Sequence, residues 1–460
     1  MWNFTPGKDK VMGRMVFAIL PFVSLLFGQW LETIIYVGKE PYSICYNSRS
    51  HKVYSANYRS NSISVIDASR NEVIRTIPDI YIPTALDYNP NNNKVYCTHG
   101  NTPRNVDRLL VIDGETDQII ADIPTGGGSF TVTHNPQNNK VYVADAANNT
   151  ITIIDGERDS LIKRVRTGSC PLEMCHNSQN NKIYCANYGV WKQTDSTVTV
   201  VDGDLDTVIA TVIVGHGPTD VVYNPVNNKI YVGTSEISIS IIDGETDSVV
   251  GSIDVGFPQM ALCYNPLNNR LYASAGGVVV IDCESNQVIA VIDTSFFIPC
   301  WLFLNPINNK LYATNFLLGQ DTSGGIMVID CESNQIVRTF SVKWDPWSFA
   351  HNPVENRVYV SAIGMEPPPY ESTIYVIRDV MGIEEYFTFK PLAAKTTPTI
   401  NRSFIDLPEG EEVRLYDITG KLIASLNEKR RVSLKGVKPG VYFLRIKKEK
   451  NEFTRKLIVQ

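Results

Sequence analysis

The residues of this chain that could do acid–base or metal chemistry recur at fixed positions of a repeated pattern. Three of the six histidines stand directly before an asparagine, where sister segments carry tyrosine; these are His134, His176 and His351. His51 falls in an expected turn, and His99 and His216 have irregular positions. Two histidines of unknown separation are a weak basis for a metal site or a general base. We therefore expect structural roles for the repeated histidines and predict no catalytic residue.

Acidic triplets are the second candidate for chemistry. Residues 113–117 and 202–206 place acids at alternate positions, as some calcium loops do. A calcium loop also needs a later bidentate acid and a glycine near its middle, whereas glycine is the second residue here. We interpret the triplets as hairpin turns, with calcium binding as the alternative. The glycine run at 126–128 lacks the lysine and helix of a phosphate-binding loop, and we predict no metal and no cofactor.

The nine cysteines follow the repeat as well. Most occupy three repeated positions at which sister segments carry Val, Ala, Thr or Gly: first Cys45, Cys175 and Cys263, then Cys97 and Cys185, then Cys283 and Cys331. Small apolar residues at the same position indicate that these cysteines serve as buried hydrophobic groups. A disulfide between Cys175 and Cys185, on strands expected to be adjacent, is the alternative.

The repeat itself is marked by anchor asparagines spaced by roughly 40 to 47 residues, which is the length of a propeller blade. The anchors are Asn47, Asn89, Asn135, Asn177, Asn224, Asn265, Asn305 and Asn352. Each unit contains four short runs with the period-two alternation and β-branched residues of strands, bounded by Asn-rich and Asp-rich turns. The pattern predicts an all-β fold, an eight-bladed β-propeller of four-stranded antiparallel blades, with seven blades as the alternative.

The last unit ends at Asp379 without a fourth strand. Residues 33–37, which precede the first unit, have the fourth-strand pattern. We predict that this segment pairs with the last blade and closes the ring, because closure protects the strand edges that an open array exposes.

Segments such as YSANYRSNSISVID, YVADAANNTITIID and YATNFLLGQDTSGGIMVID resemble the YVTN-type propeller repeat of bacterial and archaeal surface proteins. The resemblance covers residues 33–379 and implies the propeller fold. It says little about function, because the family includes proteins without a known reaction together with relatives of lactonases and quinoprotein dehydrogenases.

The N-terminus has the parts of an export signal. Lys8, Lys10 and Arg14 precede an apolar run over residues 15–27, which is short for a membrane span. We predict a signal peptide over 1–29, a propeller over 30–380 and no transmembrane span in the mature chain, with an uncleaved anchor as the alternative. The net charge of -6 gives no basic field for nucleic acid.

After a linker at 381–400, residues 401–460 form a separate pattern that predicts a small Ig-like β-sandwich. Its segments LYDITGKL, GVKPGVYFLRI and the terminal KLIV resemble the sorting domain of type IX secretion substrates. The residues that carry the resemblance are Leu415, Tyr416, Asp417, Gly420, Pro439, Gly440, Tyr442 and Lys456. The resemblance implies transfer through the periplasm, by the type IX machinery, to the cell surface or the medium. An Ig-like spacer module is the alternative.

The connections from strand two to three, and from each blade to the next, vary among the repeats and belong to one face of the disc. Aromatic, Arg and His residues, the usual anchors of binding surfaces, gather there: Tyr58, His99, Arg104, Trp191, His216, Phe257, Phe297, Trp344 and Tyr370. We interpret this face as the site for a glycan, peptide or surface-protein ligand of a non-catalytic protein. Packing between blades is the alternative, and we expect it most for Trp301 and Trp347. The competing functions are a lactonase-like or quinoprotein-like enzyme and a structural lattice component.

Overall fold

The computed structural model describes residues 28–100, 107–190, 193–294, 298–316, 324–363 and 372–379, and six strands of the C-terminal region. The described residues form strands and turns and contain no α-helix. The same part of the chain therefore holds no helix with the length and apolar character needed to cross a membrane. The signal peptide predicted for residues 1–29 lies almost wholly outside the described residues.

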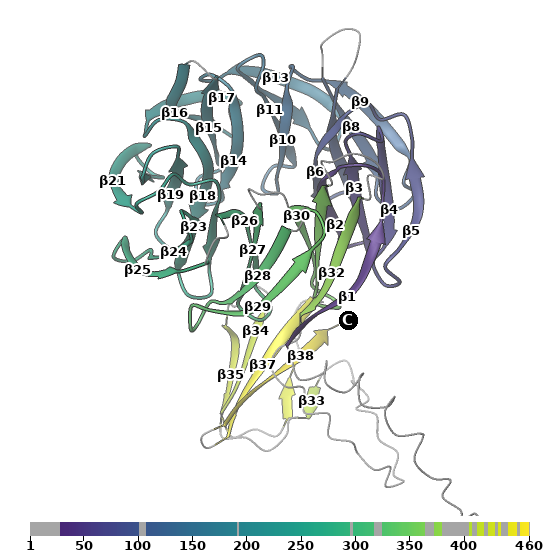
Figure 1. Cartoon of the computed structure of the whole chain (residues 1–460), viewed down its shortest axis with the longest axis vertical. Coiled ribbons are helices and arrows are strands. Elements are labelled where there is room, and N and C mark those ends of the chain that lie inside the picture. Colours follow the sequence, from purple (N-terminus) through teal and green to yellow (C-terminus); the bar gives the residue numbers. More distant parts are fainter. Residues whose placement is uncertain are drawn as a thin grey trace, which may run out of the picture.

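Eight four-stranded antiparallel sheets make up the propeller, which confirms the predicted fold and blade number (Figure 1). The inner strands are β2 (Pro41–Asn47), β6 (Pro83–Asn89), β10 (Ser129–Asn135), β14 (Pro171–Asn177), β18 (Pro218–Asn224), β22 (Leu262–Asn265), β26 (Ile298–Asn305) and β30 (Asp345–Asn352). The second strands are β3 (Lys52–Asn57), β7 (Lys94–His99), β11 (Lys140–Asp145), β15 (Lys182–Val190), β19 (Lys229–Thr234), β23 (Arg270–Ser274), β27 (Lys310–Phe316) and β31 (Arg357–Ile363). The third strands are β4 (Ser62–Asp67), β8 (Arg108–Asp113), β12 (Thr150–Asp155), β16 (Gln193–Asp202), β20 (Ser238–Asp243), β24 (Val278–Asp282), β28 (Gly324–Asp330) and β32 (Thr373–Asp379). The outer strands are β5 (Glu72–Ile77), β9 (Ile119–Pro124), β13 (Ser160–Arg166), β17 (Thr207–Ile213), β21 (Ser248–Asp254), β25 (Gln287–Ile292), β29 (Gln335–Val342) and β1 (Gln29–Tyr36).

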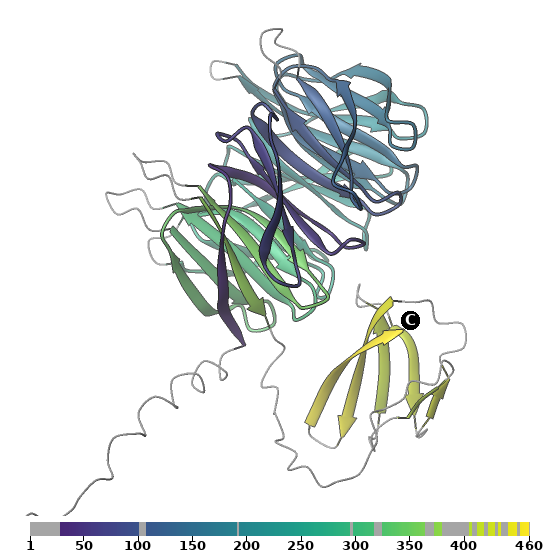
Figure 2. The same cartoon turned by 90° about the vertical axis from the view of Figure 1, so that its right-hand side faces the viewer.

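Strand β1 closes the ring, as the sequence predicts. It pairs antiparallel with β32, from Gln29 opposite Asp379 to Tyr36 opposite Thr373, and so becomes the outer strand of the last blade (Figures 1 and 2). Arg357 of the same blade donates to both carboxylate oxygens of Glu32, at 2.7 Å and 2.6 Å. The first strand of the propeller is thus held by backbone and by charge to a sheet more than three hundred residues away.

The anchor asparagines are buried because they organise the turn after the inner strand. Asn47 Oδ1 accepts hydrogen bonds from the amides of Arg49 and Ser50, at 3.0 Å each. The turn ends on a left-handed residue, for example Asn139 with φ of 59°. Asparagine tolerates this conformation better than most residues.

The same asparagines also join the blades. In successive blades the anchor Nδ2 donates to Oδ1 of the left-handed asparagine of the next blade, as between Asn89 and Asn139 at 2.7 Å and between Asn135 and Asn181 at 2.7 Å. A buried amide needs such partners, since leaving it unpaired costs free energy. The repetition of Asn in the sequence therefore reflects a series of polar contacts between blades, which runs from Asn89 to Asn305.

A second set of contacts between blades lies around the tyrosine in the middle of several second strands, namely Tyr54, Tyr184, Tyr231 and Tyr359. Tyr54 is 0% exposed, and its hydroxyl donates to Asp117 of the next blade, which also accepts from Lys52 Nζ at 2.9 Å. Asp117 is the last acid of the triplet at 113–117. Its Oδ1 thus accepts from two protein donors, and the triplet works as a hairpin turn that joins blades.

All nine cysteines are free thiols in the structure, so the alternative of a Cys175–Cys185 disulfide is wrong. Cys175 lies opposite Tyr184, whereas Cys185 lies opposite Met174. The two residues are thus one register position apart, and neighbouring positions of a sheet point to opposite faces.

The C-terminal region forms a four-stranded antiparallel sheet in the order β35-β34-β37-β38 and a two-stranded sheet β33-β36. The bounds are β33 (Phe404–Asp406), β34 (Glu412–Asp417), β35 (Leu422–Asn427), β36 (Arg431–Ser433), β37 (Gly440–Lys448) and β38 (Asn451–Val459). Leu415, Tyr416 and Asp417 lie in β34, Gly440 and Tyr442 in β37, and Lys456 in β38. Gly420 and Pro439 fall outside the described residues.

Candidate functional site

The inner strands form the edges of eight sheets around a central channel, and side chains compensate for the unpaired edge. Ser43 Oγ accepts from the amide of Leu86 in the next blade at 3.0 Å. Asp220 Oδ2 accepts from Leu262 in the same way at 2.7 Å. Backbone donors left open at an inner edge are thus satisfied by the preceding blade.

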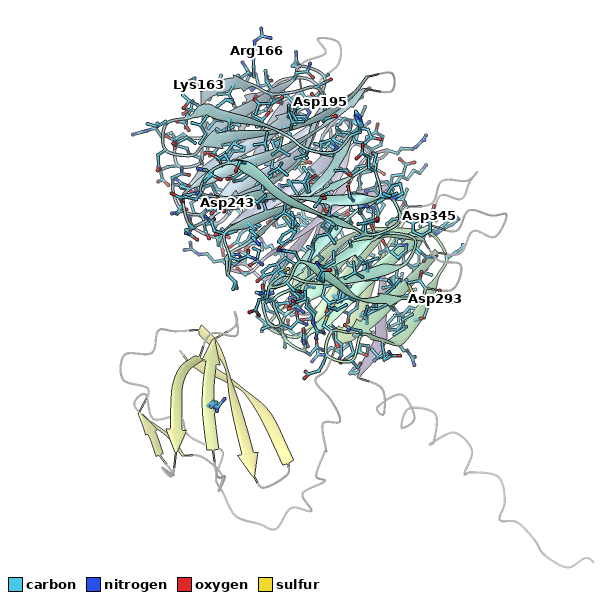
Figure 3. The ribbon with its side chains drawn as sticks, turned by 90° about the vertical axis from the view of Figure 1, so that its left-hand side faces the viewer. Lys163, Arg166, Asp195, Asp243, Asp293 and Asp345 are labelled. Atoms are coloured by element: carbon cyan, nitrogen blue, oxygen red, sulfur yellow. The ribbon has the colours of Figure 1, made fainter. Side chains whose placement is uncertain are left out.

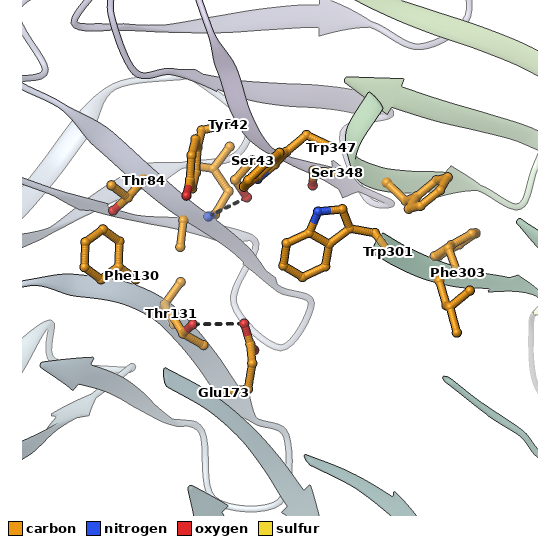
Figure 4. Close-up of a pocket in the computed structure, with 15 residues that line it drawn as sticks. Tyr42, Ser43, Thr84, Phe130, Thr131, Glu173, Trp301, Phe303, Trp347 and Ser348 are labelled. Carbon is orange, nitrogen blue, oxygen red and sulfur yellow. Dashed lines mark hydrogen bonds between the residues drawn. The ribbon is translucent and has the colours of Figure 1, made fainter. Parts of the chain in front are cut away.

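A cavity of about 340 Å³ opens between the inner strands. Its wall is built from Tyr42, Ser43, Thr84, Ala85, Leu86, Phe130, Thr131, Val132, Glu173, Trp301, Leu302, Phe303, Trp347, Ser348 and Phe349. These residues come from six inner strands. Figure 4 shows Trp301 and Glu173 pointing into the same space, with Tyr42 and Trp347 on another side of it.

Three aromatic residues of the cavity, Tyr42, Trp347 and Trp301, form a continuous wall. The ring of Trp347 lies 5.6 Å from Trp301 and 5.1 Å from Tyr42, and Tyr42 lies 5.7 Å from Tyr58. All three pairs are tilted, and such spacings are those of stabilising aromatic contacts. The indole Nε1 of Trp301 is buried and has no hydrogen-bond acceptor among the described residues. We therefore regard the rings of this wall, which line the cavity, as the surface that a ligand would contact.

Glu173 stands out among the acids of the channel. Its Oε1 accepts one long hydrogen bond, from Thr131 Oγ1 at 3.4 Å (Figure 4). Burial, followed by repulsion from Asp220, raises the pKa of Glu173 to about 7. Burial also raises the pKa of Asp87 and of Asp220 to about 6, although each accepts two backbone hydrogen bonds.

The residues predicted for the variable face are scattered. Tyr58 touches the aromatic wall through Tyr42, Trp344 is buried at 9% exposure, and Phe257 is 58% exposed. His99 contacts Asp122 in the second blade at 3.1 Å, whereas His216 contacts Ser196 of the fourth blade at 2.8 Å. Arg104, Trp191, Phe297 and Tyr370 lie outside the described residues.

Trp301 and Trp347, expected to pack between blades, line the cavity together with Tyr42 and Glu173. A sequence signal for this site existed. The residue four positions before the anchor asparagine differs widely among the units, namely Ser43, Ala85, Thr131, Glu173, Asp220, Ala261, Trp301 and Ser348. The residue before it, which includes Tyr42 and Trp347, differs as widely.

The repeated histidines have the structural role expected of them. His134 Nε2 lies 3.3 Å from Oδ1 of Asn139, the left-handed residue of its turn. Tyr88 makes the equivalent contact in the preceding blade, to Asn93 at 3.3 Å. Burial lowers the pKa of His134. Across the described ranges, no three His, Cys, Asp or Glu side chains converge closely enough to hold a metal ion.

A second hollow of about 440 Å³ lies at the connection between β9 and β10. It is lined by Thr125, Gly126, Gly127, Asn148, Thr150, Arg164 and Arg166. Arg164 donates to the carbonyl of Pro124 at 2.7 Å, and Figure 3 shows Arg166 projecting from the edge of the propeller. This hollow is basic, in contrast to the central channel.

Comparison with known proteins identifies the tail and the fold. Residues 396–460 match the family described as a secretion system C-terminal sorting domain. The C-terminal region is therefore a secretion sorting domain, which implies export of the protein to the outer surface or beyond. No curated protein matches the chain.

Two solved structures show the likeness of the propeller. The computationally designed Ika8 protein is 15% identical, with a TM-score of 0.58 over 74% of this chain and 98% of that one. The dihydro-heme d1 dehydrogenase NirN, in complex with DHE, is 12% identical, with a TM-score of 0.54 over 65% of this chain and 66% of that one. At these identities the likeness concerns the fold alone.

Proposed function

We propose that this protein is an exported binding protein, displayed on the cell surface or released, that holds its ligand in the mouth of the central channel without transforming it. One observation carries the proposal: the cavity between the inner strands combines a continuous aromatic wall with a carboxylate that has one long hydrogen bond. Aromatic anchors in a concave site with few polar groups are typical of ligand binding.

The ligand classes that suit an exported protein of this kind are a glycan, a peptide or a segment of a neighbouring surface protein. The resemblance of the repeat to YVTN-type surface proteins supports such a role and stays a prediction. A non-catalytic role agrees with the repeated histidines and with the acids of the hairpin turns, which hold turns and blades together.

The binding proposal is tested with glycan and peptide arrays probed by the full secreted chain and by its Trp301→Ala variant. The matched control is Phe257→Ala, because Phe257 is an exposed aromatic residue outside the cavity wall. We expect a ligand whose capture is lost with Trp301→Ala and kept with Phe257→Ala. Ligands that are insensitive to Trp301 would contradict the channel as the site.

We further propose that the sorting domain engages the type IX machinery after the signal peptide has brought the chain to the periplasm. Deletion of residues 401–460 is expected to leave the propeller in the periplasm, as cell fractionation would show. Unchanged surface display of the shortened chain would refute this route.

A further inference from the structure

The inner strands of the propeller have a one-sided charge. The eight segments that face the channel contain the acids Asp87, Glu173, Asp220 and, as the first residue of β30, Asp345, and contain neither lysine nor arginine. The histidines of these strands are held by turn asparagines, and burial lowers their pKa. No fixed cation of the inner strands therefore neutralises the carboxylates of the channel.

The three acids in the interior of the inner strands, Asp87, Glu173 and Asp220, are not equivalent. Asp87 accepts from the amides of His134 and Tyr88, at 2.7 Å and 2.8 Å, and Asp220 accepts two amides in the corresponding way. These two carboxylates serve the backbone of the inner edge. Glu173 lines the cavity and accepts the long hydrogen bond of the Thr131 hydroxyl, so its carboxyl oxygens are open to a ligand, and a cationic group beside them would favour the ionised form.

The opposite part of the cavity wall offers a second feature that favours positive charge. Trp301, Trp347 and Tyr42 come from three consecutive blades and present neighbouring rings. The faces of tryptophan and tyrosine rings attract ammonium groups through their quadrupole, and tryptophan does so most strongly. The attraction increases where water is excluded.

We infer that the cavity binds the ammonium end of an organic cation between the Trp301–Trp347–Tyr42 wall and Glu173. The group is a primary or quaternary ammonium, carried by a small molecule or by a lysine side chain of a peptide. This inference rests on the proposed function, because it names the ligand class of the same site.

The test is isothermal titration calorimetry on the full secreted chain with matched pairs of probes. Choline is compared with its neutral isostere 3,3-dimethyl-1-butanol, and Nα-acetyl-lysine methylamide with the norleucine equivalent. We expect each cation to bind at least about tenfold more tightly than its neutral partner. The stronger of the two cations distinguishes a small-molecule source from a peptide source.

Two variants locate the site. Glu173→Gln keeps the shape of the side chain and is expected to weaken the cation by roughly tenfold while leaving the neutral probe unchanged. Trp301→Ala is expected to weaken both cations, and Trp301→Phe to restore part of the affinity. Arg166→Ala, in the second hollow, is the control and should bind as the unchanged protein does.

Equal affinity for cation and isostere, or a Glu173→Gln variant that binds choline and the lysine probe as well as the unchanged protein, would overturn the inference. The inference would also be overturned if neither cation bound with a dissociation constant of about 1 mM or lower. A neutral glycan lost with Trp301→Ala but not with Glu173→Gln would refute the cationic class and leave the proposed function intact. The proposed function and the cationic class would both be refuted if no ligand depended on Trp301 for binding.

Discussion

The change Glu32→Gln removes the negative charge that holds the first strand to the last blade. The guanidinium of Arg357 has a side-chain exposure of 9% and Glu32 one of 27%. Apart from Glu32, the Arg357 guanidinium donates to the carbonyls of Ala68 and Ser69, at 2.7 Å and 3.5 Å. Breaking a buried ion pair costs about 3–5 kcal/mol. Because Glu32 is partly exposed and the glutamine oxygen still accepts one bond, we expect a loss of about 2 kcal/mol.

The assay is thermal unfolding of the full secreted chain, followed by circular dichroism. A loss of this size is expected to lower the midpoint by roughly 2–5 °C. The matched control is Arg158→Gln, which removes an ion pair to Asp155 whose arginine is 80% exposed. Exposed pairs contribute about 0–1 kcal/mol, so this variant should melt close to the unchanged protein. Equal midpoints for the two variants would refute the idea that the Glu32–Arg357 pair fastens the closing strand.

Three further predictions follow from individual residues. Burial and Asp220 raise the pKa of Glu173 from its ordinary value of 4.5 to about 7, so the folded state loses stability as the pH rises through this window. Glu173→Gln should therefore increase the free energy of unfolding by up to about 3 kcal/mol at about pH 8 and have little effect at about pH 4. Thermal melts that show a larger gain at the lower pH would contradict this. His134→Tyr should change the free energy of unfolding by less than about 1 kcal/mol, because Tyr88 makes the same turn contact in the preceding blade, whereas His134→Ala should lower it by about 1–2 kcal/mol. Thermal melts that rank the two variants in the opposite order would argue for a different role of His134. In native conditions iodoacetamide should label the half-buried Cys170 before the fully buried Cys97, because burial shields the Cys97 thiol and raises its pKa. Mass spectrometry of tryptic peptides measures the order of labelling, and earlier labelling of Cys97 would contradict the prediction.

The sequence alone was sufficient for the architecture because the signals of a propeller are local. Period-two alternation marks each strand, and Asn-rich turns mark each reversal, so that repetition of the unit specifies the number of blades. The closing role of β1 was also predictable, since the last unit lacks an outer strand and a matching segment precedes the first unit. The sorting domain was recognisable from the spacing of its three motifs.

The ligand site was decided by the tertiary structure. The register of the inner strands shifts near their start, for example between Pro41 and Ser43 and between Pro299 and Trp301. A shift of this kind breaks the period-two rule at the positions that face the channel, so alternation does not predict which side chains enter it. Trp301 and Trp347 contact each other across adjacent blades, as expected, and the structure adds that both also line the cavity.

Ring closure also creates properties that no local pattern contains. Tyr42 and Trp347 are three hundred residues apart in the chain, yet their rings lie 5.1 Å from each other because the first and last blades become neighbours. The raised pKa of Glu173 likewise depends on burial between blades and on Asp220 of the next blade. The sequence by itself determined the eight blades and the strand that closes the ring. Only the closed ring brings the aromatic wall and the acid into one cavity, because contact between residues far apart in the sequence depends on the order of the blades around the axis.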